Sequence, residues 1–414
     1  MNDICFPPQN TLLTAEQALS RIRQTIQPIS GSETVALSLA LGRTLAEDVF
    51  AAIDMPPQRN AAMDGYAFAA AGLSGNADFS LRMVGTSWAG KPFVGTPDQG
   101  ECVRIFTGAV VPDGADSVVA QEQTHAGADC VRFSAPCLFH KNIRPAGSDF
   151  KAEEKLLHAP RKLNPRDIGL LAAAGVAAVK VKRRLRIGFF STGDELAPLG
   201  SELDIGQIYD SNRYLLAALL ADPSFEINDL GVVKDDPQAL EAMLVSAAAH
   251  HDALLSTGGA SVGEADYIKQ VLEKCGQINF WKLAIKPGKP LAFGKIGGCW
   301  FFGLPGNPVA VLVTYHKFVK PGLDHLLGAL PRPTLELRAR SESELRKVPG
   351  RCEYQRGILK QGENGEFTVT AAGPQDSHQL KVASMANCFI VLDTDCAGVS
   401  RGDWVLVEPF SIDL

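Results

Sequence analysis

The chain has 414 residues, of which 46% are hydrophobic and 21% are charged, and its formal net charge at pH 7 is −6. This composition is typical of a globular protein with several domains and excludes disordered, fibrous and collagen-like classes. The mildly acidic charge argues against a nucleic-acid-binding surface, so a site for a small anion would need a local cluster of basic residues.

The N-terminal segment "MNDICFPPQN" has no cationic stretch and carries two prolines where a signal peptide needs an apolar core, so we do not expect secretion. The longest apolar run, residues 168–179, is shorter than the ~20 residues of a membrane-spanning helix and contains two glycines. The nine cysteines form no C-x-x-C pair, and the eight histidines show no metal-binding spacing. We therefore expect a cytoplasmic protein with reduced thiols that contacts neither a membrane nor nucleic acid.

The first half of the chain indicates a helical arm that carries an inserted β-domain. A Thr-capped amphipathic helix begins after Thr14, and the segment "SLALGRTLAED" predicts a second helix. Residues 51–147 contain short β-branched runs such as "ECVRIF" between Gly and Pro turns, which predict a small β-domain. Helical signals return at Asn164, which can cap a helix with proline at its first position. We expect the arm to combine residues 1–50 with residues 148–180.

The second half of the chain predicts an α/β domain followed by a further β-domain. From Arg184 onward, apolar strands such as "RIGFFSTG" and "DALLSTGG" alternate with helices such as "SNRYLLAALLAD". This alternation predicts a parallel sheet with crossover helices over residues 181–330. Residues 331–414 contain strands and turns but no clear helix, which predicts a separate, barrel-like C-terminal β-domain. The predicted fold class is therefore α/β plus β, in a multidomain chain.

Acidic residues follow three of the predicted strands, in the pairs Asp194 and Glu195, Asp235 and Asp236, and Glu264 and Asp266. A later strand ends in a Gly-Pro loop at residues 303–308. Ligands of parallel α/β sheets bind beyond the carboxyl ends of the strands, so we expect these four loops to share one edge of the sheet. Any single acid at a strand end can instead be a helix cap, but recurrence in three loops favours a site.

The segment "STGGASVGEADY" combines glycines and acids in one loop. Gly258, Gly259 and Gly263 would let backbone N–H groups approach a phosphate closely. The carboxylates of Glu264 and Asp266 would repel that phosphate, by roughly 4 kcal/mol at about 4 Å and a protein-surface dielectric. A divalent cation such as Mg²⁺ removes the conflict, because it binds carboxylate and phosphate oxygens together. The loop therefore predicts a site for a phosphate-containing ligand with a metal ion.

The segment "WKLAIKPGKP" is interpreted as a strand that presents two lysines on one face. The two-residue period of a strand places Lys282 and Lys286 together, with Trp281, Leu283 and Ile285 on the opposite face. The prolines that follow exclude a helix, so the next lysine belongs to a loop. The pattern is consistent with an anion site, and also with a solvated edge strand whose lysines prevent aggregation.

Nine motifs in chain order resemble those of the MoeA-type molybdopterin molybdenumtransferases, the molybdenum insertases related to the E domain of gephyrin. They are "NAAMDGYAF", "IFTGAVVPDGAD", "RPAGSDF", "FSTGDEL", "GQIYDSNR", "TGGASVGEADY", "KLAIKPGKP", "GLPGNPV" and "EYQRG". The resemblance spans nearly the whole chain. Its departures are small: Ala260 stands where the family commonly has valine, and Asp376, beside Ser377, stands where glycine is common.

The resemblance implies a homodimer of elongated, four-domain subunits with a MogA-like α/β domain. It implies insertion of molybdenum from molybdate into adenylylated molybdopterin, with release of AMP and with Mg²⁺ as the metal ion. It also implies that the β-domain of one subunit approaches the α/β domain of the other. Transient contacts with other proteins of molybdenum cofactor biosynthesis are expected.

The resemblance also assigns site residues. It implies that the catalytic acids are Asp64, Glu195, Asp235 and Asp266, of which Glu195, Asp235 and Asp266 hold the metal. The implied substrate-binding residues are Thr107, Asp149, Gly258, Gly259, Ser261, Lys282, Lys286, Pro305, Pro308, Arg356 and Ser377. Without the resemblance, Asp64 reads as a turn residue because Asp-Gly is a common turn dipeptide, and Arg356 and Ser377 have no local signature.

Two other functions stay open at this point. One is a molybdopterin adenylyltransferase or nucleotide pyrophosphatase that uses the same α/β domain; the arm and the two β-domains argue against a lone domain of that kind. The other is a scaffold that binds a peptide of a partner protein, as the gephyrin E domain does. The acids and lysines favour catalysis without excluding this second role.

Overall fold

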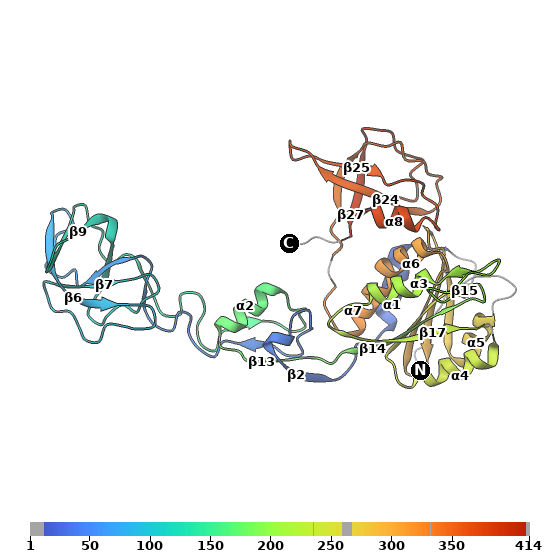
Figure 1. The fold of residues 1–414 in the computed structure, drawn as a ribbon, viewed down its shortest axis with the longest axis horizontal. Coiled ribbons are helices and arrows are strands. Elements are labelled where there is room, and N and C mark those ends of the chain that lie inside the picture. The colour runs from blue at the N-terminus through green and yellow to red at the C-terminus, as the bar shows by residue number, and fades with distance from the viewer. Residues whose placement is uncertain (1–11, 235, 259–266, 332, 411–414) are drawn as a thin grey trace.

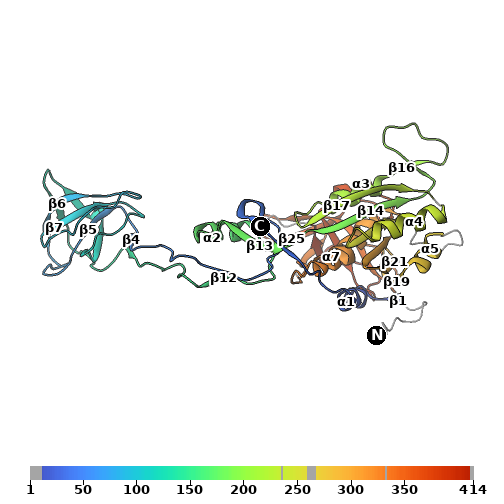
Figure 2. The ribbon, with the colours of Figure 1, turned by 90° about the horizontal axis from the view of Figure 1, so that it is seen from below.

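The computed structural model describes residues 12–234, 236–258, 267–331 and 333–410. The molecule is elongated, and two perpendicular views show the same separation of its parts (Figure 1, Figure 2). The β-domain, whose sheet runs through residues 65–133, lies at one end. A narrow arm of residues 32–61 and 143–182 connects it to the α/β domain, whose main body is residues 185–326. The C-terminal β-domain, residues 337–409, lies beside the α/β domain.

A seven-stranded sheet forms the centre of the α/β domain. In spatial order its strands are β1 (Leu12–Leu13), β19 (Gln277–Leu283), β21 (Pro290–Ile296), β22 (Cys299–Leu304), β18 (Ala253–Thr257), β14 (Leu185–Thr192) and β17 (Phe225–Val233). The last four are mutually parallel, as the alternation of strands and helices predicts. The expected all-parallel sheet is nevertheless mixed, because β21 runs antiparallel to β19 and β22. Only Gly297 and Gly298 join β21 to β22, which is too short for a crossover connection.

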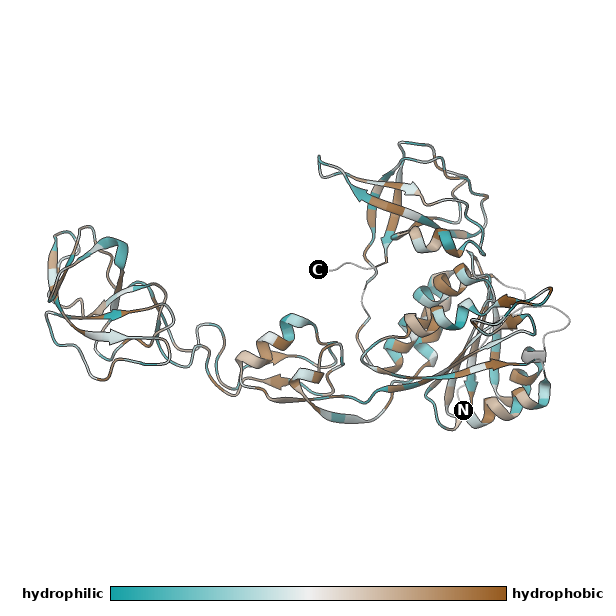
Figure 3. Cartoon of the chain, viewed as in Figure 1, coloured by the Kyte–Doolittle hydropathy of each residue, from teal (hydrophilic) through white to brown (hydrophobic). Residues whose placement is uncertain are grey.

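Helices cover both faces of this sheet (Figure 1). They are α1 (Ala15–Thr25), α3 (Ser211–Leu219), α4 (Pro237–Ala248), α5 (Tyr267–Cys275), α6 (Pro308–Thr314) and, after a π-helical turn at Tyr315–Val319, α7 (Lys320–Leu326). Residues of α1, α3, α6 and α7 share one hydrophobic core cluster, and residues of α4 and α5 belong to another. Hydrophobic residues lie along the strands between these helices (Figure 3). The central strands β14, β18, β21 and β22 are therefore buried on both faces, as their apolar sequences require, whereas the edge strand β17 is mostly exposed.

The first helix differs from the expected arm in its position. Thr14 caps it as predicted, because the Thr14 side chain accepts a hydrogen bond from the backbone N–H of Gln17, at 3.2 Å. Ala18 and Ile22 are fully buried in the core cluster of the α/β domain, so the helix packs there and not in the arm. Periodicity showed the apolar face of this helix, but only the tertiary structure shows which core that face joins.

The arm is a ribbon in which the outgoing chain pairs with the returning chain three times. The pairs are β2 (Ser32–Ala36) with β13 (Ala178–Lys182), β3 (Val49–Phe50) with β12 (Lys155–Leu157), and β4 (Asn60–Ala61) with β11 (Ile143–Arg144), all antiparallel. Beside them, α2 (Pro165–Ala173) begins at the predicted Asn164 cap. The second predicted helix is wrong: after β2 the chain forms only a 3₁₀ turn at Leu37–Leu39. Backbone groups there bond to the returning strand, as in Ala46 N–H to Lys180 O at 3.0 Å, and so cannot form a helix.

The β-domain contains a six-stranded sheet inserted between the two strands of the arm. In spatial order its strands are β8 (Ser117–Ala120), β5 (Gly65–Phe68), β7 (Glu101–Ile105), β6 (Phe79–Ser87), β10 (Cys130–Phe133) and β9 (Thr124–Ala126), with a 3₁₀ turn at Gln121–Gln123. Its core is aromatic: the rings of Phe79 and Phe133 stack at 4.8 Å, and Phe68 meets Phe133 edge-on at 5.1 Å.

The C-terminal domain closes into a five-stranded barrel, as the sequence predicts. Its strands are β23 (Leu337–Ser341), β24 (Cys352–Gln361), β25 (Phe367–Ala371), β26 (Cys388–Leu392) and β27 (Trp404–Pro409), and pairing of β24 with β26 closes the ring. A short helix, α8 (Leu380–Met385), was not expected. A further strand, β20 (Ile285–Lys286), comes from the α/β domain and pairs with β24. This strand ties the two domains together.

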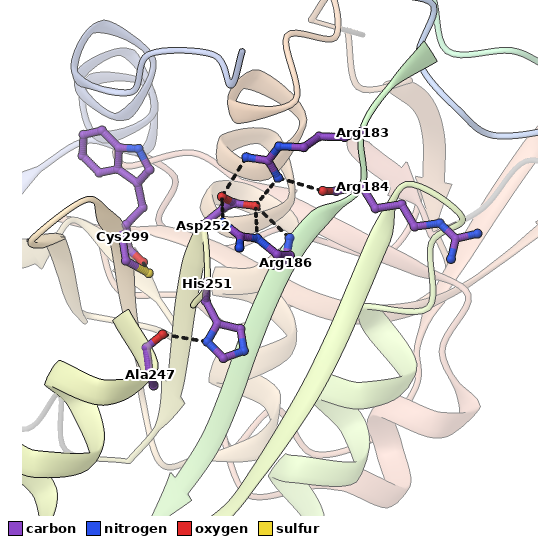
Figure 4. Close-up of polar contacts among 8 residues, drawn as sticks. Arg183, Arg184, Arg186, Ala247, His251, Asp252 and Cys299 are labelled. Atoms are coloured by element: carbon purple, nitrogen blue, oxygen red, sulfur yellow. Dashed lines mark hydrogen bonds and ion pairs between the residues drawn. The ribbon is translucent and has the colours of Figure 1, made fainter. Parts of the chain in front are cut away.

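An ion cluster fixes the point where the arm joins the α/β domain (Figure 4). The Asp252 carboxylate accepts two hydrogen bonds from Arg183, at 2.6 and 2.9 Å, two from the Arg186 side chain, at 3.1 and 3.5 Å, and one from the Arg186 backbone N–H, at 2.9 Å. Burial opposes ionisation of Asp252, but these hydrogen bonds outweigh it and hold the pKa of Asp252 at about 2.

Among the residues described, no helix combines the length and apolar content that crossing a membrane requires.

Candidate active site

The carboxyl ends of three parallel strands meet at one edge of the α/β sheet, as predicted. Ser191 of β14 pairs with Thr257 of β18, and Thr257 pairs with Leu304 of β22. The loops after these strands therefore start side by side. Beneath them, the Ser191 hydroxyl lies 2.9 Å from the Thr257 hydroxyl and donates to the buried Asp210 carboxylate, at 3.1 Å. These hydrogen bonds form a rigid polar floor under the loops.

A cleft of about 520 Å³, here the interdomain cleft, lies above this edge and extends to the C-terminal domain. The residues that line it include Gly258, Lys286, Lys289, Pro305, Arg351 and Ser377. The structure thus brings together four of the expected site residues, Gly258, Lys286, Pro305 and Ser377, from four separate segments of the chain. Three cationic side chains in one cleft of an acidic protein form the local basic cluster that an oxyanion needs.

Gly258 starts the glycine loop in a conformation that requires glycine. Its φ is +86°, and a Cβ atom there would lie 2.7 Å from the backbone oxygen of Thr192. Across the cleft edge, the Asn212 side chain donates a hydrogen bond to the Gly306 carbonyl, at 2.6 Å, and so anchors the Gly-Pro loop. Asn212 belongs to the "GQIYDSNR" motif, which could have indicated it. Gly259 and Ser261, also expected to bind substrate, lie outside the described residues.

The lysine strand changes sheets halfway along. Trp281, Leu283 and Ile285 are buried as predicted, while Lys286 is exposed. However, β19 ends at Leu283, and the next strand belongs to the C-terminal barrel. Lys282 is on β19 and is not among the described residues that line the interdomain cleft. Of the two predicted lysines, the structure places only Lys286 in the cleft.

A buried carboxylate that the sequence reading missed holds Lys286. The Lys286 Nζ lies 3.2 Å from Oε1 of Glu353, whose residue surface is only 4% exposed. The other carboxylate oxygen of Glu353 accepts a hydrogen bond from Gln355, at 3.1 Å, and Gln355 also donates to the Arg346 carbonyl, at 3.0 Å. Glu353 is the first residue of the quoted "EYQRG" motif. It comes from the barrel and restrains a lysine of the α/β domain.

Arg356 lies behind the cleft. It is 1% exposed, and its Nη2 donates to the carbonyls of Pro374 and Asp376, at 3.2 and 3.0 Å. Burial lowers the pKa of the Arg356 guanidinium, because the charged form loses hydration. The same loop presents Ser377 to the cleft, and the Ser377 carbonyl accepts a hydrogen bond from the Val309 N–H at the start of α6, at 3.1 Å. Arg356 therefore supports the Ser377 loop and does not line the cleft among the described residues.

The acidic residues at the strand ends have different environments. Glu195 is exposed after β14, and its carboxylate folds over Gly193, where a Cβ atom would lie 2.4 Å from it. It makes no ion pair or side-chain hydrogen bond with a described residue. Asp236 caps α4 by accepting from two backbone N–H groups, so it is a helix cap. Asp235 and Asp266 lie outside the described residues, and within the described part no three acidic, His or Cys side chains gather as a metal site.

Two expected site residues meet in the β-domain, at the opposite end of the molecule (Figure 2). The Asp64 carboxylate accepts hydrogen bonds from the Thr107 backbone N–H and hydroxyl, at 2.8 and 2.7 Å. These bonds lower the pKa of Asp64 below its usual value, the backbone bond contributing most. Asp149 is exposed on the returning chain, where its N–H bonds to the Met55 carbonyl at 2.9 Å. Within one subunit, neither Asp64 nor Thr107 approaches the interdomain cleft.

A second cleft, of about 500 Å³, lies between α1, the π-helical turn and the barrel. Two of the charges that line it neutralise each other: Lys317 pairs with Glu408 and lies 4.7 Å from the centre of the Tyr354 ring. Burial lowers the pKa of His316 to about 4 and keeps it neutral at physiological pH. No described strand-end loop of the sheet borders this cleft. The interdomain cleft is therefore the better candidate for an active site.

Comparison with known proteins identifies the class to which this architecture belongs. The model of the MoeA N-terminal region (domains I and II) matches residues 13–175, that of a probable molybdopterin binding domain matches residues 188–325, and that of the MoeA C-terminal region (domain IV) matches residues 338–410. A crystal structure of the molybdopterin biosynthesis MoeA protein from Pyrococcus horikoshii is 27% identical, covers 97% of this chain and 100% of its own, and superposes with a TM-score of 0.83.

Two curated relatives are similar to this chain over nearly its full length. The molybdopterin molybdenumtransferase of Haemophilus influenzae is 40% identical over 97% of this chain and 99% of its own, and that of a Nostoc species is 38% identical over 92% and 89%. The chain belongs to the MoeA family of molybdopterin molybdenumtransferases.

Proposed function

We propose that the chain inserts molybdenum from molybdate into adenylylated molybdopterin and releases AMP. The observation that carries this proposal is the interdomain cleft, which Lys286, Lys289 and Arg351 line together with Gly258 and Ser377. Molybdate and the phosphates of the nucleotide are oxyanions, which such a cluster binds. The names of the relatives supply the reaction, since both are called molybdopterin molybdenumtransferases.

The cleft residues act by binding and orienting. Lys286 and Lys289 act as point charges for oxyanions, and the Ser377 hydroxyl donates a hydrogen bond. Pro305 and Pro308 restrict the backbone of the Gly-Pro loop, so the loop loses little freedom when a ligand binds. Gly258 lets the backbone of its own loop approach the ligand.

Mg²⁺ is the metal ion that we propose for this site. The environment of Glu195 fits, because its carboxylate is exposed at the strand edge and is not neutralised by a described cation. Glu195 would hold the ion together with Asp235 and Asp266. When bound, Mg²⁺ would neutralise phosphate charge during cleavage of the phosphoanhydride bond.

The elongated shape supports a site shared between two subunits. Asp64 and Thr107 lie in the β-domain, which the whole arm separates from the interdomain cleft of the same chain (Figure 1). We propose a homodimer in which the β-domain of one subunit faces the cleft of the other, so that two equivalent sites form. Asp149, near the root of the β-domain, would contribute to the same shared site.

The remaining expectations complete the proposal. The chain would act in the cytoplasm, with transient contacts to other proteins of molybdenum cofactor biosynthesis. Its domains would be the arm, residues 1–50 with 148–180, the β-domain at 51–147, the α/β domain at 181–330 and the C-terminal domain at 331–414. Residues 12–26 join the α/β domain in this scheme, because their helix packs there.

An assay of AMP release tests the reaction. Purified protein is incubated with adenylylated molybdopterin and Mg²⁺, with and without molybdate. We expect AMP only when molybdate is present, in amounts equal to the molybdenum incorporated. AMP release without molybdate would indicate a pyrophosphatase instead. Formation of adenylylated molybdopterin from ATP and molybdopterin would indicate an adenylyltransferase.

A further inference from the structure

We propose that Trp88, at the end of the β-domain that carries Asp64 and Thr107, is a stacking platform for a planar heterocycle of the substrate. This inference rests on the proposed function and deepens it, because adenylylated molybdopterin contains two such rings, adenine and pterin. Both are flat, nitrogen-containing rings with exocyclic amino groups. Stacking on an aromatic side chain is the usual way in which proteins bind rings of this kind.

The sheet topology brings Trp88 to the same end as Asp64 and Thr107. Strands β6 and β7 are parallel, with Ser87 opposite Ile105, so the residues that follow each strand leave at one end. Strand β5 runs antiparallel to β7, with Gly65 opposite Ile105, so the residue before Gly65 lies at that end as well. These residues are Trp88, Phe106 with Thr107, and Asp64.

The indole of Trp88 is held in place before any ligand arrives. Its ring stacks on Phe106 with centroids 4.1 Å apart and planes inclined by 10°. The Arg104 guanidinium carbon lies 4.7 Å from the centre of the Phe106 ring, and Arg104 also donates a hydrogen bond to the Gly65 carbonyl, at 2.9 Å. Two backbone hydrogen bonds between Trp88 and Lys91, both of 3.0 Å, close the turn that carries the indole. A pre-organised ring loses little conformational entropy when it binds a ligand.

The exposure of Trp88 has no explanation in the packing of the β-domain. Trp88 is 51% exposed, and neither it nor Phe106 belongs to a hydrophobic core cluster of the β-domain. Trp281 and Trp300 are buried, with only 5% and 7% of their surface exposed. Trp404 is 43% exposed, but Arg340 and Arg338 lie 4.5 and 5.5 Å from its ring centre. Stacking on Phe106 covers one face of the Trp88 indole, which leaves the other face for a ligand.

Asp64 gives the platform a hydrogen-bond acceptor. One Asp64 oxygen, Oδ1, accepts both bonds from Thr107, while Oδ2 accepts none from a described residue. Thr107 directly follows Phe106, so the carboxylate is fixed next to the stacked rings. A heterocycle on Trp88 could direct an amino group at this carboxylate. Stacking with an adjacent acid selects amino-substituted rings such as adenine and pterin over plain aromatic ones.

Replacing the tryptophan tests the platform. We expect Trp88→Ala to raise the KM for adenylylated molybdopterin about tenfold or more in the AMP-release assay, as loss of a stacked base usually does. Trp88→Phe keeps a flat ring and should retain most of the affinity. Trp404→Ala, which removes the other exposed tryptophan, is the matched control and should leave KM unchanged. All three variants should remain folded, and Trp88→Ala should lose no more stability than Trp404→Ala, which loses an aromatic contact of similar strength.

Titration with two fragments of the substrate identifies the ring. Wild-type tryptophan fluorescence is measured with AMP alone and with molybdopterin alone, and Trp88→Phe gives the signal of the other tryptophans. Weaker binding of only AMP by Trp88→Ala assigns adenine, and weaker binding of only molybdopterin assigns pterin. An unchanged KM and unchanged binding of both fragments, with a wild type that is active, would overturn the platform alone. A wild type that releases no molybdate-dependent AMP would instead overturn the proposed function.

Discussion

The interdomain cleft and the Trp88 end of the β-domain are built in opposite ways. The cleft lies between two hydrophobic cores, and fully buried polar residues such as Glu353 and Arg356 hold its loops. The Trp88 end of the β-domain presents Trp88, Asp64 and Thr107 on a small sheet that a two-stranded arm carries. The cleft encloses a volume within one chain, whereas the Trp88 end offers side chains to a ligand that another part of the dimer must enclose. We infer that the two regions complete each other across a dimer.

The largest expected effect comes from replacing one acid of each region in two separate variants. Asp64→Ala and Asp266→Ala homodimers should each be nearly inactive, since every site would lack one acid. A heterodimer with one variant of each kind has two shared sites. One of them carries both lesions, and the other carries neither. Random re-pairing of the two inactive proteins should therefore restore about a quarter of the wild-type activity per subunit, because half of the dimers have one intact site.

Differently tagged subunits confirm that exchange has occurred in this experiment. If both acids instead acted within one chain, every site of the heterodimer would have one lesion. Activity that stays absent after confirmed exchange would reject the shared site. It would also show that the arm bends far enough to join the two regions within a subunit.

The next effect concerns stability of the cleft. Arg356→Ala should lower the free energy of unfolding by about 2–4 kcal/mol, because it removes a buried side chain and leaves two loop carbonyls without their donor. Ser377→Ala, on the same loop but facing the cleft, should change stability by less than about 0.5 kcal/mol and weaken substrate binding instead. Urea denaturation measures the first, and KM in the AMP-release assay the second. An Arg356→Ala protein of normal stability and poor KM would show that Arg356 contacts the substrate directly.

The stability of the junction between the arm and the α/β domain should depend on pH. The folded pKa of Asp252 is about 2, below its ordinary value of 3.8, so its ionisation favours the folded state above pH 4. This contribution, about 2 kcal/mol, is lost as the pH falls from about 4 to about 2. Asp252→Asn should therefore unfold more easily than the wild type at pH 7, and the difference should shrink toward pH 2. Melting curves across this range, with Asp149→Asn as an exposed control, check the prediction.

The smallest expected effects distinguish two roles of Lys286, which are binding of the substrate and neutralisation of the buried Glu353. Lys286→Gln should weaken binding of adenylylated molybdopterin about tenfold, while the free energy of unfolding falls by no more than about 1 kcal/mol. The small loss arises because Glu353 stays buried without its cation. Adding Glu353→Gln should recover that stability but not the affinity. If the double variant regained affinity, the role of Lys286 would be to neutralise Glu353 and not to bind an anion.

Local sequence signals predicted the elements well where neighbouring residues decide them. The Thr14 and Asn164 caps, the strands of the α/β domain and the buried face of the lysine strand follow from short-range stereochemistry and periodicity. The aligned strand ends follow from a general property of parallel sheets. Of the expected cleft residues, Gly258 and Lys286 were found in this way. Arg356 and Ser377 came only from the family resemblance, because neither lies in a pattern with a local physical meaning.

The sequence by itself determined the fold class, the amphipathic helix after Thr14 and the strand-end loops, because propensities, caps and hydrophobic periods act within a few residues along the chain. The tertiary structure decided which core that helix joins, that the segment after β2 pairs with a returning strand, and that Glu353 restrains Lys286. It also decided that Arg356 supports the Ser377 loop from behind and that the length of the arm separates Asp64 from the cleft. These outcomes depend on contacts between segments tens to hundreds of residues apart, and no local pattern records the partner of such a contact.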